Sequence, residues 1–66
     1  MEMFKVESSC INEIGWENDK LYVKFSSGLY VYDNIKREVF LAMLGAKSRG
    51  RFFLANIKNK YSYKKI

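Results

Sequence analysis

Residues 20–32, KLYVKFSSGLYVY, restrict the fold more than any other part of the chain, because their side chains alternate in character. Leu21, Val23 and Phe25 share one face of an extended chain, which is the pattern of a half-buried strand. The serines and Gly28 that follow are turn residues. We therefore predict two antiparallel strands joined by a tight turn.

A further strand is predicted immediately before this hairpin. Ile11, Ile14 and Trp16 occur within CINEIGWEN, and the polar END sequence at 17–19 supplies a turn. The three strands together form an antiparallel meander.

The loop length of the hairpin decides which way its tyrosines face. A three-residue loop, with the glycine in a left-handed position, pairs Phe25 with Leu29 and places Tyr30 and Tyr32 opposite the aliphatic face, together with Tyr22. A two-residue loop instead places the tyrosine pair beside the aliphatic residues. The three-residue loop fits glycine chemistry and is our prediction. The alternative for the rings is burial under a helix, against a phenylalanine, with the hydroxyls in water.

After residue 32 the apolar spacing becomes helical. The first helix, capped by Asn34 or Asp33 and ended by Gly45, presents apolar residues at intervals of three and four: Ile35, Val39, Phe40, Met43 and Leu44. A second helix, capped by Ser48, presents Phe52, Phe53, Ala55 and Ile57, with Lys58 and Lys60 in or near its last turn.

These elements predict a single α+β domain over residues 1–66, a three-stranded antiparallel meander followed by two short helices. Residues 1–7 are expected to be an N-terminal lead-in. Residues 62–66 are expected to be a frayed tail, although the mixed aromatic and basic sequence NKYSYKK at 59–65 is also typical of a flexible nucleic-acid-binding arm.

Charge divides the chain into two unequal parts. Residues 1–46 carry five basic groups and all seven acids, whereas residues 47–66 carry seven basic groups and no acid. A concentration of cations of this kind favours an anionic partner, most often nucleic acid, because phosphate contacts release counterions. The simpler interpretation is a solvated basic tail.

Composition excludes several classes of function. The chain has one cysteine, Cys10, and no histidine, so neither an internal disulfide nor a metal site is expected. The acids have no histidine to partner them and the serines have no evident base, so we expect no catalysis and no cofactor. We also expect no membrane span, and residence in the cytoplasm.

The order of residues resembles the KTSC domain, which takes its name from the C-terminal extension of some lysyl-tRNA synthetases. The segments that carry the resemblance are SSCINEIGW, LYVKFSSG, YVY, VFLAML and AKSRGRFFLANIKNKY. Two departures are visible: the family's Val-Pro step after the tyrosine pair reads Ile35-Lys36 here, and the spacing from the glycine to the tyrosines is one residue shorter. The resemblance implies no established activity, and attachment to a tRNA synthetase suggests RNA binding.

Two groups of residues are candidates for binding an anion or nucleic acid. The first is the start of the second helix with the cations after it: Lys47, Ser48, Arg49, Gly50, Arg51, Lys58 and Lys60. The second is an exposed aromatic surface for stacking unpaired bases: Tyr22, Tyr30 and Tyr32. For the first group, the alternative is a plain helix cap with a packing glycine.

We therefore predict a non-catalytic module that binds nucleic acid, with RNA favoured. The alternative is a protein-binding module or small inhibitor that uses its tyrosine and phenylalanine surface, as a homodimer or with another protein.

Overall fold

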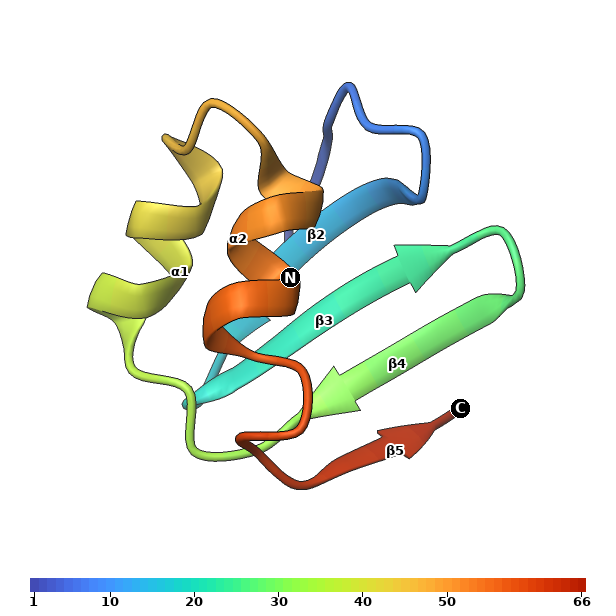
Figure 1. Ribbon diagram of the computed structural model, residues 1–66. Helices are drawn as coiled ribbons and strands as arrows, with labels where there is room; N and C mark the ends of the chain where they lie inside the picture. The colour runs from blue at the N-terminus through green and yellow to red at the C-terminus, as the bar shows by residue number, and fades with distance from the viewer.

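Five strands and two helices follow one another in the computed structural model of residues 1–66 (Figure 1). In chain order they are β1 (Met3–Lys5), β2 (Ile11–Glu17), β3 (Lys20–Phe25), β4 (Gly28–Tyr32), α1 (Arg37–Leu44), α2 (Arg49–Asn56) and β5 (Tyr63–Lys65). The strands form one antiparallel sheet in the order β1-β2-β3-β4-β5. The predicted α+β class with two helices is correct, but the count of three strands is wrong.

The two additional strands lie at the edges of the sheet, in segments expected to be a lead-in and a frayed tail. β1 pairs with the middle of β2, with Phe4 opposite Ile14, and β5 pairs with β4, with Tyr63 opposite Tyr32. Each has three residues, and those of β5 are all exposed. Backbone pairing rather than side-chain burial defines β5, so its sequence does not alternate between buried apolar and exposed polar residues.

The turn between β2 and β3 follows from two residues with left-handed backbone. Asn18 and Asp19 have φ of 53° and 60°, and Glu17 pairs with Lys20 across the turn. A two-residue hairpin with positive φ at both positions matches the twist of the strands, and asparagine and aspartate tolerate that conformation. The predicted polar turn is confirmed.

The turn between β3 and β4 contains two residues, so the predicted three-residue loop is wrong. Phe25 pairs with Gly28 and Val23 pairs with Tyr30, leaving Ser26 and Ser27 as the loop. Gly28 is the first residue of β4 and has φ of 143°, a backbone conformation that residues other than glycine rarely adopt. The register places both tyrosines on the face that carries Val23.

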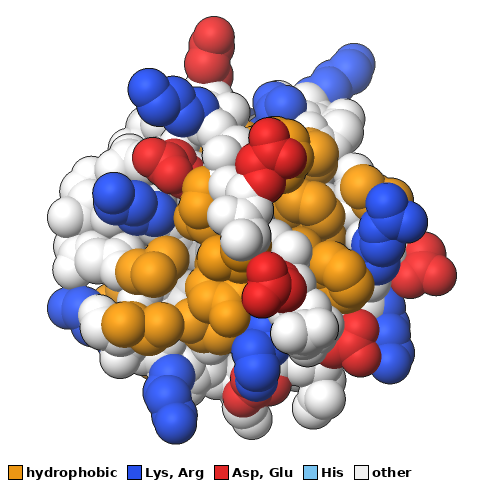
Figure 2. Space-filling view, turned by 180° about the vertical axis from the view of Figure 1, so that it is seen from behind, with side chains coloured by type: hydrophobic (Ala, Val, Ile, Leu, Met, Phe, Trp, Pro, Cys, Tyr) orange, Lys and Arg blue, Asp and Glu red, His pale blue; other side chains and the backbone are white.

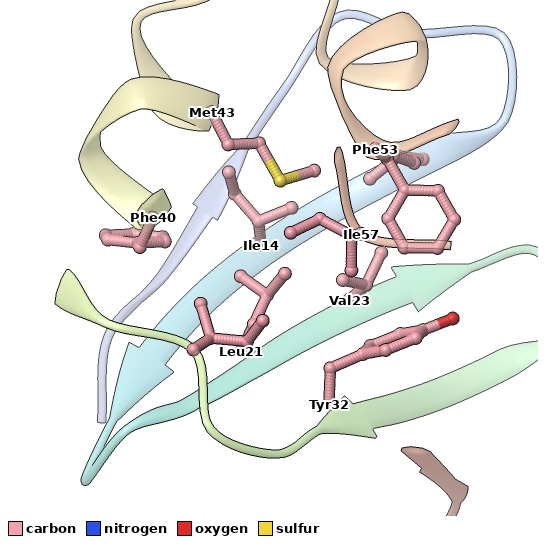
Figure 3. Close-up of a cluster of buried hydrophobic side chains, with 10 residues drawn as sticks. Ile14, Leu21, Val23, Tyr32, Phe40, Met43, Phe53 and Ile57 are labelled. Carbon is pink, nitrogen blue, oxygen red and sulfur yellow. The ribbon is translucent and has the colours of Figure 1, made fainter. Parts of the chain in front are cut away.

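Both helices lie on one face of this sheet, toward its β1–β2 side, and leave the β4–β5 side of that face without a helix (Figure 1). The core between them is made of ten buried residues: Ile11, Ile14, Leu21, Val23, Tyr32, Ile35, Phe40, Met43, Phe53 and Ile57. Tyr32 lies below Phe53, and its hydroxyl points away from Leu21 (Figure 3). The observed register differs from the predicted one because it turns two tyrosine rings toward the core, and these rings offer the core more apolar area than Leu29 and Val31.

The helix starts differ in how well they were predicted. α1 begins at Arg37 after Lys36, which makes no side-chain cap, so the predicted cap at Asn34 or Asp33 is wrong. Ile35 is fully buried and its N–H donates to the Asp19 carbonyl, which holds that residue outside the helix. α1 ends at Gly45, as predicted.

α2 starts as predicted. The Ser48 hydroxyl accepts a hydrogen bond from the Arg51 N–H at 3.2 Å. Lys58 and Lys60, predicted in or near the last turn of this helix, lie just after it, because α2 ends at Asn56. Neither eight-residue helix has the length and apolar character that crossing a bilayer requires.

Candidate functional site

An open groove of about 670 Å³ lies between α2 and the β4–β5 side of the sheet. Its walls come from the β1–β2 loop, the β3–β4 turn, β4, the start of α2, the segment after α2, and β5. The part of this sheet face that no helix covers therefore forms the larger of the two concave surfaces of the molecule. Sites for ligands are usually concave surfaces of this size.

Five aromatic rings form a closed cycle along this groove. The ring centroids are 5.4 Å apart for Phe25–Tyr30, 5.8 Å for Tyr30–Tyr63, 5.2 Å for Tyr63–Tyr32, 5.3 Å for Tyr32–Phe53 and 5.4 Å for Phe53–Phe25. Three of the five contacts are edge-to-face and Tyr63 is stacked on Tyr32. These are the geometries that aromatic pairs prefer, so the cycle is a well-packed aromatic wall.

The three tyrosines of this wall differ in exposure. Tyr32 is 5% exposed, Tyr30 is half-buried, and Tyr63 is 59% exposed. The Lys65 ammonium lies 5.9 Å from the Tyr30 ring centroid, within the range of a cation–π contact. The prediction that Tyr30 and Tyr32 face solvent is therefore wrong for Tyr32, whose ring is buried against Phe53.

The environment of Tyr32 also changes its acidity. Burial of the ring raises the pKa of the phenol, and the nearby Tyr63 and Tyr30 add to that rise. Tyr32 is therefore a neutral phenol over the physiological pH range.

Cations line the same groove. Lys47, Arg51 and Lys58 contribute to its walls and are all exposed, whereas Glu7 is the one acidic residue there. None of the seven basic residues after Ala46 takes part in an ion pair. The three ion pairs of the molecule all use groups from the first part of the chain: Met1 N-terminus with Glu17, Lys20 with Asp33, and Lys36 with Asp19. The basic side chains of this groove therefore have no acidic side chain of the protein as an ion-pair partner.

The start of α2 forms one end of the groove. Ser48 and Gly50 line it, and a Cβ atom built on Gly50 would lie 3.4 Å from the Ser8 hydroxyl oxygen. That oxygen accepts hydrogen bonds from the backbone N–H groups of Cys10 and Ile11. A Cβ at position 50 would therefore be at about ordinary contact distance from Ser8, and the approach of the β1–β2 loop to α2 does not by itself require a glycine.

Not all the predicted residues lie in the groove. The structure brings together Lys47, Ser48, Gly50, Arg51, Lys58, Tyr30 and Tyr32. Arg49 and Lys60 do not line it, and the Arg49 Nε atom is buried without a hydrogen-bond partner. Tyr22 lies on the opposite face of the sheet, since it stands between the core residues Leu21 and Val23 in β3 and side chains alternate along a strand.

Tyr63 and the β1–β2 loop are groove residues that were not predicted. The signal for Tyr63 was the alternation of aromatic and basic residues at 59–65. No sequence pattern indicates Ser8, Ser9 and Cys10 as groove residues, because their place beside α2 depends on how the helices pack on the sheet.

Comparisons with known proteins identify the fold and the family. The family model described as the KTSC domain matches residues 7–61. The crystal structure of the KTSC domain protein YPO2434 from Yersinia pestis is 34% identical, with a TM-score of 0.93, and the match covers 98% of this chain and 96% of that one. Among curated proteins, no sequence matches the chain. The protein therefore belongs to the KTSC domain family.

Proposed function

We propose that this protein is a non-catalytic module that binds single-stranded nucleic acid in the groove between α2 and β5. The observation that carries the proposal is that Lys47, Arg51 and Lys58 line the same groove as the aromatic wall. Single strands are commonly held by cations that follow the phosphates and by aromatic rings that stack on the bases. The groove offers both within one surface.

RNA is favoured over DNA for two reasons. Hydroxyl-bearing side chains line the groove at Ser8, Ser9, Ser27 and Ser48, and such groups hydrogen-bond readily to the ribose 2′-hydroxyl. The association of the family with lysyl-tRNA synthetases also places such a domain next to RNA. We further propose that the protein works in the cytoplasm, where such RNA is found.

The proposed function is tested by the binding of a fluorescein-labelled short single-stranded RNA, followed by fluorescence anisotropy at two salt concentrations. Matched single-stranded DNA and a tRNA serve as competitors. We expect affinity to fall steeply as salt rises, because phosphate neutralisation releases counterions. Absence of RNA and DNA binding at low salt would refute the proposal.

Paired charge-reversal variants locate the binding surface. Arg51→Glu combined with Lys58→Glu changes two groove residues, and Lys60→Glu combined with Lys64→Glu changes two exposed residues outside the groove by the same charge. We expect the first pair to weaken RNA binding much more than the second. Equal weakening would show that net charge, and not the groove, controls binding.

The outer face of the sheet favours protein binding as a second candidate function. Met3, Tyr22 and the buried Val31 lie in one row across β1, β3 and β4 on this face, and Ile66, which is 72% exposed, continues it past β5. Figure 2 shows apolar side chains on this face with charged side chains of both signs among and around them. Binding of a partner here would respond little to salt, which distinguishes it from RNA binding in the groove.

A further inference from the structure

Tyr63 carries the most accessible ring of the aromatic wall. Its exposed fraction is 59%, against 5% for Tyr32. Tyr30 is half-buried, with an edge-to-face contact to Phe25, a tilted contact to Tyr63 and the Lys65 ammonium above its ring. A planar base that enters the groove therefore meets an open ring at Tyr63 and largely covered rings elsewhere.

The orientation of this ring is fixed without a ligand. The Tyr63 and Tyr32 ring planes are inclined by 29° with centroids 5.2 Å apart, and Tyr32 packs in turn on Phe53 in the core. The backbone of Tyr63 pairs with Tyr32, and the Asp33 N–H donates to the Ser62 carbonyl at 2.9 Å. A ring held in this way loses little conformational entropy when a base stacks on it.

Charged and polar groups surround the ring in a way that suits a nucleotide. Lys58 and Asn59 line the groove together with Tyr63, and Arg51 lines it from α2. A nucleotide carries its phosphate a short distance from its base, so a base at Tyr63 keeps its phosphates within the cationic part of the groove. A base in a duplex has both ring faces stacked on neighbouring bases, so the site suits an unpaired base.

We propose that Tyr63 is the residue on which an unpaired base of the bound strand stacks, an inference that rests on the proposed function. Tyr32 and Tyr30 support that ring from below and beside it and do not form the contact surface. The site therefore binds a single nucleotide of the strand through its base, while Lys47, Arg51 and Lys58 hold the phosphates around it.

The test compares a labelled single-stranded RNA with an abasic strand of the same length, each titrated with Tyr63 variants. Tyr63→Ala should weaken binding of the RNA by roughly 5- to 150-fold, the range found when a stacking ring is removed. Binding of the abasic strand should not change, since the phosphate contacts remain. Tyr63→Phe should bind both strands as the unaltered protein does.

Two further variants separate stacking from structure. Tyr63→Leu keeps an apolar side chain against Tyr32 but lacks an aromatic ring, so it should weaken RNA binding while leaving the melting temperature nearly unchanged. Tyr22→Ala removes a tyrosine from the outer face of the sheet and should bind RNA normally.

Three results would overturn the inference. If the alanine and leucine variants bind RNA as the unaltered protein does, the base lies elsewhere in the groove. If they weaken RNA and abasic strand equally, β5 has a structural role alone. If the unaltered protein binds neither strand, the proposed function itself is refuted, and the inference with it.

Discussion

The indole Nε1 of Trp16 donates a hydrogen bond to the backbone carbonyl of Ile35 at 2.8 Å. This contact joins β2 to the segment that precedes α1, at a residue whose side chain is fully buried in the core. This hydrogen bond holds the segment before α1 against the sheet. It therefore contributes to where the helices pack, including the position of α2 beside the groove.

Substitution of Trp16 by phenylalanine should therefore destabilise the protein more than its loss of apolar area suggests. The variant leaves the Ile35 carbonyl without its partner in a part-buried hydrogen bond, so the cost should lie at the lower end of the roughly 1–3 kcal/mol of an unpaired buried group. The free energy of unfolding from urea denaturation measures this effect. An unchanged free energy of unfolding would show that the contact does not stabilise the helix approach.

Gly28 and Gly45 should respond differently to substitution by alanine. Gly28 has φ of 143°, and a Cβ there would lie 2.9 Å from Lys65 Cε, so Gly28→Ala should cost on the order of 1–3 kcal/mol. Gly45 has φ of −90° and no neighbour nearer than 3.6 Å, so Gly45→Ala should change stability little. Thermal melting of both variants tests this, and equal melting temperatures would contradict the account of the β3–β4 turn.

Stability should fall at alkaline pH because of Tyr32. The pKa of this phenol is higher in the folded protein than in the unfolded chain. The contribution of Tyr32 to the free energy of unfolding is therefore complete below about pH 10, and it is lost as the pH rises through the pKa of the folded state. Melting temperature measured from neutral to strongly alkaline pH should show the loss. Tyr32→Phe should reduce the slope above pH 10, and an unchanged slope would mean that another group causes the effect, such as Lys20, whose pKa is raised by its hydrogen bond to Asp33.

Cys10 reports on the groove in the unmodified protein. It is the one cysteine, it is exposed, and it lines the groove. Bound single-stranded RNA should slow its alkylation by iodoacetamide, whereas RNA bound at the outer face of the sheet should not. The rate of modification, followed by mass spectrometry with and without RNA, distinguishes the two. The same rate with saturating RNA would place the ligand outside the groove.

Much of the fold could be predicted because local signals agree with the tertiary structure. The alternation around Leu21 and Val23, the END turn and the Ser48 cap all act over a few residues. The two edge strands were not predicted because three residues are too few to show alternation. In addition, β5 is held by backbone hydrogen bonds, which do not depend on the pattern of its side chains.

The faces of the tyrosines could not be predicted from the hairpin alone. Glycine chemistry favoured a three-residue loop, but the register is set by Tyr30 and Tyr32 packing on Phe25 and Phe53. That preference depends on α2, which lies more than fifteen residues further along the chain. The candidate cations were predicted from charge asymmetry, but their division between groove and other surfaces depends on where α2 packs.

Backbone amide chemical-shift mapping by NMR, during titration with a short single-stranded RNA, shows whether the strand binds in the groove. We expect the largest shifts at groove residues, namely Cys10, Tyr30, Ser48, Gly50, Arg51 and Tyr63, with small shifts at Tyr22 and Lys24 on the outer face of the sheet. Unperturbed groove amides, or shifts centred on Tyr22 and Ile66, would contradict binding in the groove.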